Sequence, residues 1–255
     1  MGVTLRLAGD LAMFTPARWR SGVVEIGYDG TSSLGHLVES VGVPLPEVGA
    51  LWVGGRLVPL SARVSDGAGV DVDPMPRPQR LGEWPPRFLL DVHLGSLARR
   101  LRVVGVDAAY VPGADDKALV STAVDEGRVL LTKDRALLMR RALPAGAYVR
   151  GSRADDQLAD VLSRFDPPLQ PFRRCPACNG RLADVPKSVV ESGLEPGTRR
   201  SYNEFAQCAG CGRVYWRGAH SRHLDEVVRR ATRGDHPERG SCTGASGARS
   251  IRRRA

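Results

Sequence analysis

Residues 87 to 166 alternate between short apolar runs and amphipathic stretches, and this alternation constrains the fold more than any other feature of the chain. Apolar runs of this length predict strands, and amphipathic stretches with a 3.6-residue period predict helices. The predicted strands are RFLLD, VDAAYV, RVLLT and GAYVR, and the predicted helices are LGSLARRLRVVG, DDKALVSTAVDEG, RALLMRRAL and ADDQLADVLSRF. Strands separated by helices favour right-handed crossovers, so we expect an α/β domain with a mostly parallel sheet and helices on both faces.

Acidic residues follow three of these predicted strands. Asp91 ends the first strand, Asp115 and Asp116 follow the second, and Asp134 follows the third. Because the carboxyl ends of parallel strands lie at one edge of a sheet, we expect these carboxylates to share one rim. Each acid also precedes a predicted helix, where aspartate is a good N-cap, so capping alone explains any single one of them equally well.

Capping does not explain why aspartate follows three successive strands, because Ser, Thr and Asn cap helices equally well. Carboxylates gathered in one place repel one another, and a divalent cation would relieve that repulsion. Mg²⁺ and Mn²⁺ prefer carboxylate and water oxygens, so the rim suggests metal-assisted phosphodiester hydrolysis. A receiver domain would need a paired lysine after a later strand, and a P-loop enzyme would need G-x-x-x-x-G-K-S/T; neither is evident.

Two cysteine pairs indicate a second kind of metal site. Cys175 and Cys178 form one C-x-x-C pair, and Cys208 and Cys211 form another about thirty residues later, while Cys242 stands alone. Four thiolates at this spacing predict a closed tetrahedral Zn²⁺ site of the zinc-ribbon type. A closed shell leaves no position for substrate, so we expect the zinc to be structural.

Aromatic and basic residues are interleaved after the second cysteine pair. In GRVYWRGAHSRH, Tyr215 and Trp216 lie among Arg213, Arg217 and Arg222. This pattern suits base stacking and phosphate contact on single-stranded RNA. Packing of the ribbon against the neighbouring domain accounts for the two aromatic residues equally well, and both interpretations stay open.

Residues 1–76 predict a separate small domain. The strands VTLRLAG and VVEIGY precede the helix TSSLGHLVESVG, and the strands ALWVGGRLV, with a hairpin turn at Gly54-Gly55, and GVDVDPM follow it. This is a β-grasp order and resembles ubiquitin-like and sulfur-carrier domains. Such carriers end in an exposed Gly-Gly, whereas this segment continues as VDVDPMPRPQR. We therefore expect a docking module for a protein partner and not covalent transfer.

The remaining segments are assigned by composition. Residues 77–86 are rich in proline and polar groups and predict a linker, with Trp84 anchored on a neighbouring surface. The net charge is +9, and nine arginines against four acidic residues from Arg222 onward contribute +5 of it. Residues 225–255 therefore predict a basic tail that is disordered after a short helix. A basic balance permits a nucleic-acid partner without proving one.

No apolar run reaches the roughly 18 residues that a bilayer span needs, so no membrane association is expected. The first residues lack the features of a secretion signal, so we expect a cytoplasmic protein.

Several of these segments, in this order, resemble one known family. RFLLDVHLGSLARRLRVVGVDAAYV, DD, EGRVLLTKDRALL and CPACNG…CAGCGRVYWRGAH are similar to the PIN-like RNase family named for the C-terminal domain of the Mut-seven exonuclease. The resemblance covers about residues 87–224 and implies a PIN-like nuclease domain at 87–172 followed by a Cys₄ zinc ribbon at 173–224. Bacterial members often carry an N-terminal ubiquitin-like domain, which matches residues 1–76.

The resemblance also implies roles for individual residues. Asp91, Asp116 and Asp134 would hold catalytic Mg²⁺ or Mn²⁺, with Asp115 as a substitute for Asp116. A fourth acid would come from Asp155 or Asp156.

Substrate binding is expected from basic and aromatic residues near these acids and in the ribbon: Lys133, Arg135, Tyr215, Trp216 and Arg217. The chain departs from the family at Lys133, where the family has arginine, and at Ala219, where it has serine. Lysine keeps the charge at position 133 but loses the bidentate fork of arginine.

The sequence thus predicts a metal-dependent ribonuclease that acts on RNA, with structural zinc. A non-catalytic RNA-binding or adaptor protein with the same fold is the alternative, and a ubiquitin-like partner module fused to a degenerate nuclease is the third hypothesis.

Overall fold

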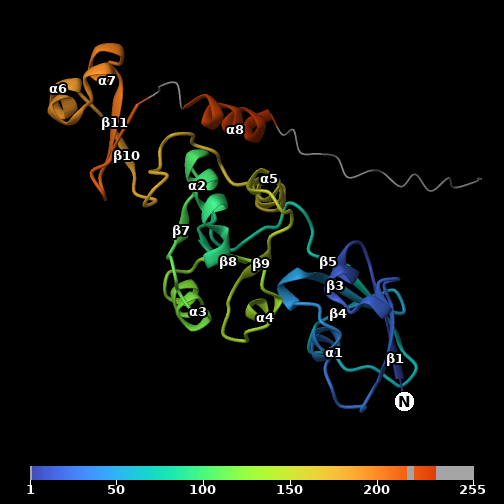
Figure 1. Cartoon of the computed structure of the whole chain (residues 1–255). Helices are drawn as coiled ribbons and strands as arrows, with labels where there is room; N and C mark the ends of the chain where they lie inside the picture. The colour runs from blue at the N-terminus through green and yellow to red at the C-terminus, as the bar shows by residue number, and fades with distance from the viewer. Residues whose placement is uncertain (1, 217–220, 234–255) are drawn as a thin grey trace, which may run out of the picture.

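A computed structural model of the chain describes residues 2–216 and 221–233 (Figure 1). These residues form three sheets with their own helices, in the order in which the sequence predicts them. The N-terminal sheet and the C-terminal ribbon lie on opposite sides of the central parallel sheet (Figure 1). No helix in the described part of the chain has both the length and the apolar character of a membrane-spanning segment.

The N-terminal domain is a five-stranded sheet of order β2-β1-β5-β3-β4 covered by one helix. Its elements are β1 (Gly2–Leu7), β2 (Val23–Gly27), α1 (Leu34–Ser40), β3 (Val48–Val53), β4 (Arg56–Val58) and β5 (Gly69–Pro74). The first and last strands, β1 and β5, pair in parallel at the centre, whereas the other pairs are antiparallel. The predicted β-grasp arrangement is therefore confirmed. Positive φ angles at Gly54 and Gly55 form the predicted β3–β4 hairpin turn.

The central domain is a four-stranded parallel sheet of order β7-β6-β8-β9. Its elements are β6 (Phe88–Leu90), α2 (Gly95–Val103), β7 (Ala108–Tyr110), α3 (Asp116–Asp125), β8 (Val129–Thr132), α4 (Arg135–Leu138), β9 (Gly146–Tyr148) and α5 (Ala154–Phe165). Every predicted strand and helix of this region is present. The helix predicted for RALLMRRAL is shorter than expected: α4 ends at Leu138, and turn hydrogen bonds from the Arg140 and Leu143 amides then lead the chain toward β9.

Helices cover both faces of the parallel sheet. Side chains of α2, α5 and α8 (Ser221–Arg233) pack with Phe88 and Leu90 on one face, whereas α3 and α4 pack with Leu89 on the other. The chain leaves α2, which ends at Val103, through Gly105; the φ of +88° at Gly105 suits glycine, and a Cβ there would lie 1.9 Å from the Gln170 carbonyl oxygen. The predicted α/β class with helices on both faces is therefore confirmed.

The ribbon is a three-stranded antiparallel sheet, β10 (Leu182–Val185), β11 (Phe205–Cys208) and β12 (Val214–Trp216). Two short helices, α6 (Lys187–Val190) and α7 (Pro196–Ser201), lie between β10 and β11. The buried Arg102 on α2 donates to the carbonyl oxygens of Pro176 (3.2 Å) and Ala177 (2.8 Å). Asn179 bonds Asp107 and the Ala108 amide, at the start of β7. The ribbon is therefore attached at the amino ends of the parallel strands.

The predicted linker and the start of the predicted tail both pack more closely than their composition predicts. Residues 77–86 contain no helix or strand, yet Arg77 pairs with Asp160 at 2.8 Å and Leu81 packs against the central core. Trp84 stays about half exposed (49%), which gives little support to its predicted anchoring. In the predicted tail, residues 225–233 belong to α8 and Val227 is buried, whereas 234–255 lie outside the described residues.

Candidate active site

Two of the predicted rim acids are linked by one hydroxyl group at the end of β8. Asp91 follows β6, is buried, and accepts hydrogen bonds from Thr132 Oγ1 (2.7 Å) and the Val92 amide (2.5 Å). Thr132 is fully buried, and its Oγ1 also accepts from the Asp134 amide at 2.9 Å. Since Thr132 contacts both residues, it fixes the spacing between the ends of β6 and β8.

Asp134 both caps a helix and lines a cavity. Its carboxylate accepts from the amides of Ala136 (2.7 Å) and Leu137 (3.4 Å), which makes it the N-cap of α4. The same residue lines a cavity of about 1000 Å³. The two interpretations of this acid therefore do not exclude each other.

The two acids after β7 have different positions. Asp115 caps α3 through the Ala118 amide (2.7 Å) and is absent from the cavity lining. Asp116 is the first residue of α3 and lines the cavity, where its carboxylate pairs with Arg140 at 3.1 Å.

The candidates for a fourth acid lie elsewhere. Asp155 is ion-paired with Arg100 on α2, and Asp156 is exposed in the first turn of α5. Neither residue lines the cavity.

The cavity therefore gathers Asp91, Asp116 and Asp134 from the carboxyl ends of three parallel strands. The carboxylate oxygens of these three acids do not all lie within 4.8 Å of one another. Among residues 2–216 and 221–233, only the four cysteines form a group of potential metal ligands that close. Mg²⁺ usually keeps several waters and binds proteins through one or two carboxylates. The donor set thus fits a hydrated hard cation and does not form a complete protein shell for one.

Basic groups lie beside these acids. Lys133 and Arg135 flank Asp134 and line the same cavity, as does His93 after β6. The Lys133 ammonium donates to the Gly151 carbonyl oxygen (2.8 Å), and Arg135 Nη1 donates to the carbonyl oxygen of Phe14 in the N-terminal domain (2.5 Å). The cavity therefore holds carboxylates and cations together, which suits a phosphate-bearing ligand held beside a metal.

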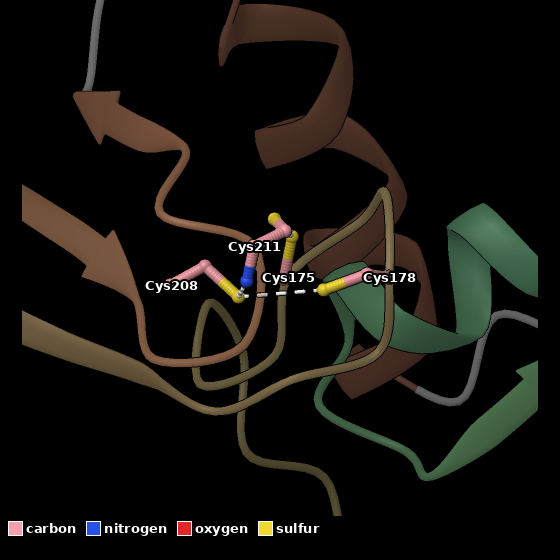
Figure 2. A group of neighbouring side chains, drawn as sticks. All are labelled: Cys175, Cys178, Cys208 and Cys211. Atoms are coloured by element: carbon pink, nitrogen blue, oxygen red, sulfur yellow. Dashed lines mark hydrogen bonds between the residues drawn. The ribbon is translucent and has the colours of Figure 1, made fainter.

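The four cysteines form the second site (Figure 2). The sulfur atoms are separated by 3.4 Å for Cys178–Cys208 and 3.7 Å for Cys175–Cys211, and all four lie within 4.8 Å of one another. A tetrahedron with Zn–S bonds of about 2.3 Å has edges of about 3.8 Å. The geometry therefore fits a structural Zn²⁺ ion.

The ionisation of these thiols also fits a cation at their centre. Burial raises the pKa of Cys175, but hydrogen bonds from Tyr215 and from the Cys178 and Ala177 amides outweigh burial and lower this pKa to about 6. The Gly180 amide lowers the pKa of Cys178, yet burial and the neighbouring cysteines together raise it to about 12. Without a metal the thiols therefore resist ionising together, and Zn²⁺ would remove that resistance.

The aromatic residues of the ribbon do not reach the carboxylate cavity. Tyr215 Oη lies 3.0 Å from Cys175 Sγ, and Trp216 is 41% exposed beside the rings of Tyr202 and Phe205. Both line a separate cavity of about 730 Å³ in the ribbon. Of the other predicted binding positions, Arg217 lies outside the described residues, as does Ala219.

Two features of the site were not predicted from the sequence. The first is Thr132, because a threonine at the end of an apolar strand gives no sign in the sequence that its hydroxyl will bond both Asp91 and the Asp134 amide. The second is the far wall of the cavity, which comes from the N-terminal domain and includes the continuous segment Phe14–Arg20. Nothing in the local sequence of that segment signals a contact about a hundred residues away.

Comparison with known proteins identifies the families that the two larger parts of the chain match. Residues 86–228 match the family described as Mut7-C RNAse domain, and residues 1–80 match the family described as Mut7-C ubiquitin. A Homo sapiens protein named Exonuclease mut-7 homolog is 33% identical over 166 residues, which is 60% of this chain and 18% of that protein. The chain thus spans less than a fifth of that relative's length. No solved structure matches the chain.

Proposed function

Because the chain belongs to the Mut7-C RNAse domain family and carries an N-terminal Mut7-C ubiquitin domain, we propose that it is a metal-dependent ribonuclease whose active site is the carboxylate cavity. The observation that carries the proposal is the convergence of Asp91, Asp116 and Asp134 from three strand ends on one cavity. The proposed substrate is single-stranded RNA, whose phosphates are free to enter beside these acids.

Each residue of the cavity has a defined part in this proposal. Asp91, Asp116 and Asp134 would hold Mg²⁺ or Mn²⁺, which when bound lowers the pKa of a water ligand and stabilises charge on phosphoryl oxygens. Thr132 orients the Asp91 carboxylate through the 2.7 Å hydrogen bond. Lys133 and Arg135 would hold the phosphate next to the scissile bond.

A second candidate, a non-catalytic RNA-binding or adaptor protein, is favoured by the state of two acids. Asp116 is paired with Arg140, and Asp134 is engaged as a helix cap. An enzyme would need Asp116 to leave Arg140 when metal binds. Cleavage of RNA that disappears on addition of EDTA separates the two candidates.

The decisive variant is Asp134→Asn, because Asn can still cap α4 but lacks the charge that a hard cation needs. We expect RNA cleavage in Mn²⁺ to fall by more than about 100-fold, beyond the 10–100-fold typical of residues that only support a ligand. Thermal melting in EDTA should stay near that of the wild type, since the cap is kept.

The matched control is Asp125→Asn, at the exposed end of α3 and outside the cavity lining, which should cleave RNA like the wild type. Undiminished cleavage by Asp134→Asn would remove this residue from the metal site and count against the ribonuclease assignment. The variant Asp115→Asn, tested in parallel, distinguishes a cap from a ligand after β7.

A further inference from the structure

The carboxylate cavity has a second wall opposite the acids, and this wall does not come from the ribbon. The ribbon contacts Arg102, Asp107 and Ala108, at the amino ends of the parallel strands, whereas the acids lie at the carboxyl ends. The second wall belongs instead to the N-terminal domain, through Phe14–Arg20 and the segment 40–42.

We propose that the N-terminal β-grasp domain forms one wall of the RNA-binding cleft, where Arg18 and Arg20 bind phosphates of single-stranded RNA and Trp19 stacks against a base. This inference rests on the proposed ribonuclease function and assigns to the domain a part in substrate binding.

The three side chains have the chemistry that nucleic-acid binding requires. Arg18 and Arg20 are exposed, and neither forms an ion pair with any residue in the described part of the chain. The Arg18 guanidinium lies 4.2 Å from the centroid of the Trp19 ring, and Trp19 is itself partly packed against the N-terminal core. Aromatic rings and arginine side by side favour base stacking together with phosphate contact.

Buried contacts between the N-terminal and central domains hold this wall in position. Glu47 of the N-terminal domain and Arg164 of α5, both 2% exposed, pair at 2.5 Å. The same carboxylate accepts from the Tyr148 amide at 2.8 Å, and the Phe14 and Tyr148 rings meet edge to face at 5.1 Å. In addition, Arg135, beside the catalytic acids, donates to the Phe14 carbonyl oxygen. A domain fixed by these contacts keeps Arg18 and Arg20 over the cavity.

The charges favour RNA over a protein as the ligand of this wall. The cations of the N-terminal domain face a cavity whose other side carries Asp91, Asp116 and Asp134. Lys133 and Arg135 lie beside the acids, so with metal bound a phosphodiester chain passing between the walls would find cations on both sides, which suits a polyanion. Without metal, Arg18 and Arg20 on the N-terminal wall remain to bind its phosphates. An acidic protein partner is the competing ligand, and RNA binding decides between them.

The test is RNA binding by the full chain in EDTA, where the substrate stays intact. A fluorescein-labelled single-stranded RNA would be titrated with wild type, the double variant Arg18→Ala/Arg20→Ala, and Arg56→Ala as control. Arg56 is an exposed arginine of β4 outside the cavity lining. The double variant should lose about tenfold or more in affinity and flatten the slope of log K against log salt by about 1.4, which is about 0.7 for each lost phosphate contact. The control should match the wild type in both quantities.

Base stacking is tested separately with Trp19→Ala and Trp19→Phe. We expect alanine to weaken binding roughly tenfold and phenylalanine to restore much of it, since any aromatic face can stack on a base. Rescue by phenylalanine in a protein with wild-type melting supports stacking, and equal binding by both variants and the wild type excludes it.

Failure of this inference can be told apart from failure of the ribonuclease proposal. If the double arginine variant binds RNA with wild-type affinity and salt slope, the N-terminal wall does not bind RNA and the inference is overturned, whatever the cleavage rate. If that variant loses affinity while Asp134→Asn still cleaves normally, the wall binds RNA and only the assignment of the metal site fails.

Discussion

Thr132 shows how one side chain can organise the carboxylate rim. Its hydroxyl donates to Asp91 and accepts from the Asp134 amide, so it ties the loop after β6 to the loop after β8. The residue is fully buried, and water cannot replace either bond without rearrangement of the strand ends. It is a positioning residue, because it acts through Asp91 and does not itself line the cavity.

We therefore expect Thr132→Val to impair cleavage although it preserves the shape of the side chain. Valine leaves one Asp91 oxygen and the Asp134 amide without their partner, which costs about 1–3 kcal/mol for each buried group left unsatisfied. RNA cleavage should fall by about 10–100-fold, the range for residues that orient a metal ligand. In a Mn²⁺ titration, half-maximal cleavage should require a higher Mn²⁺ concentration than in the wild type.

The control is Thr132→Ser, which keeps the hydroxyl and should retain most of the activity and the wild-type Mn²⁺ titration. If Thr132→Val and Thr132→Ser were equally active, the hydroxyl would have no part in positioning Asp91.

The sequence predicted the rim acids better than it predicted their surroundings. The positions of Asp91, Asp116 and Asp134 follow from strand ends, which hydrophobic periodicity locates well. The pairing of Asp155 with Arg100 depends on how α2 and α5 pack, and the pairing of Asp116 with Arg140 depends on the turn after α4. Such contacts join residues far apart in the chain, and periodicity carries no information about them.

At the scale of elements, the ribbon is attached to the parallel sheet but set apart from the carboxylates. Its zinc cysteines are held by turns at Cys175–Gly180 and after β11, and Asn179 and Arg102 connect it to the start of β7. The C-x-x-C spacing predicted the cysteine cluster, but no local signal shows to which edge of the sheet a ribbon attaches. For this reason the sequence could not show that Tyr215 and Trp216, which it predicted either to bind RNA or to pack the ribbon, line a cavity separate from that of the rim acids.

Purified protein should contain about one zinc per chain, and Cys178→Ser should lower that content. Without four thiolates the ribbon loses the binding energy that folds it, so solubility and melting temperature should fall. RNA cleavage per folded molecule should change far less, since the ribbon contacts the opposite ends of the strands.

Metal analysis and melting curves for Cys178→Ser, with Cys242→Ser as the matched control, would check this expectation. Cys242 is outside the two C-x-x-C pairs, so its substitution should leave the zinc content unchanged. Folded wild-type protein without zinc would contradict the structural role of the site.

At the scale of the whole molecule, the most deeply buried ion pair between the N-terminal and central domains joins Glu47 to Arg164, and Arg150 adds weaker pairs to Glu47 (3.4 Å) and Asp10 (3.0 Å). The Arg164 side chain donates to Glu47 (2.5 Å), to Gln79 Oε1 (2.8 Å) and to the Pro46 carbonyl oxygen (3.0 Å). The β-grasp order and the parallel sheet were each predictable from their own segments, because each has its own hydrophobic periodicity. Their docking was not, because it depends on a pair of charges separated by more than a hundred residues.

Breaking this pair should weaken the junction strongly. In Glu47→Gln the amide oxygen can still accept from Tyr148, but Arg164 is left as a buried charge without a counterion, which typically costs about 3–5 kcal/mol. Urea unfolding followed by tryptophan fluorescence should show this loss, either as a lower midpoint or as a separate early transition of the N-terminal domain. If the domain also forms a wall of the cleft, RNA affinity in EDTA should fall toward that of Arg18→Ala/Arg20→Ala.

Two further variants separate the buried charge from the loss of a contact. Adding Arg164→Met to Glu47→Gln removes the uncompensated charge, and apolar replacement of a buried pair is often neutral, so the double variant should recover much of the stability. Asp71→Asn breaks an exposed pair with Arg6 in the same domain and should leave the unfolding midpoint near that of the wild type. A Glu47→Gln protein as stable as Asp71→Asn would mean that the junction does not depend on this ion pair. In that case the position of the N-terminal wall would have to come from other contacts, such as Phe14–Tyr148, Arg135–Phe14 and the Arg150–Asp10 ion pair.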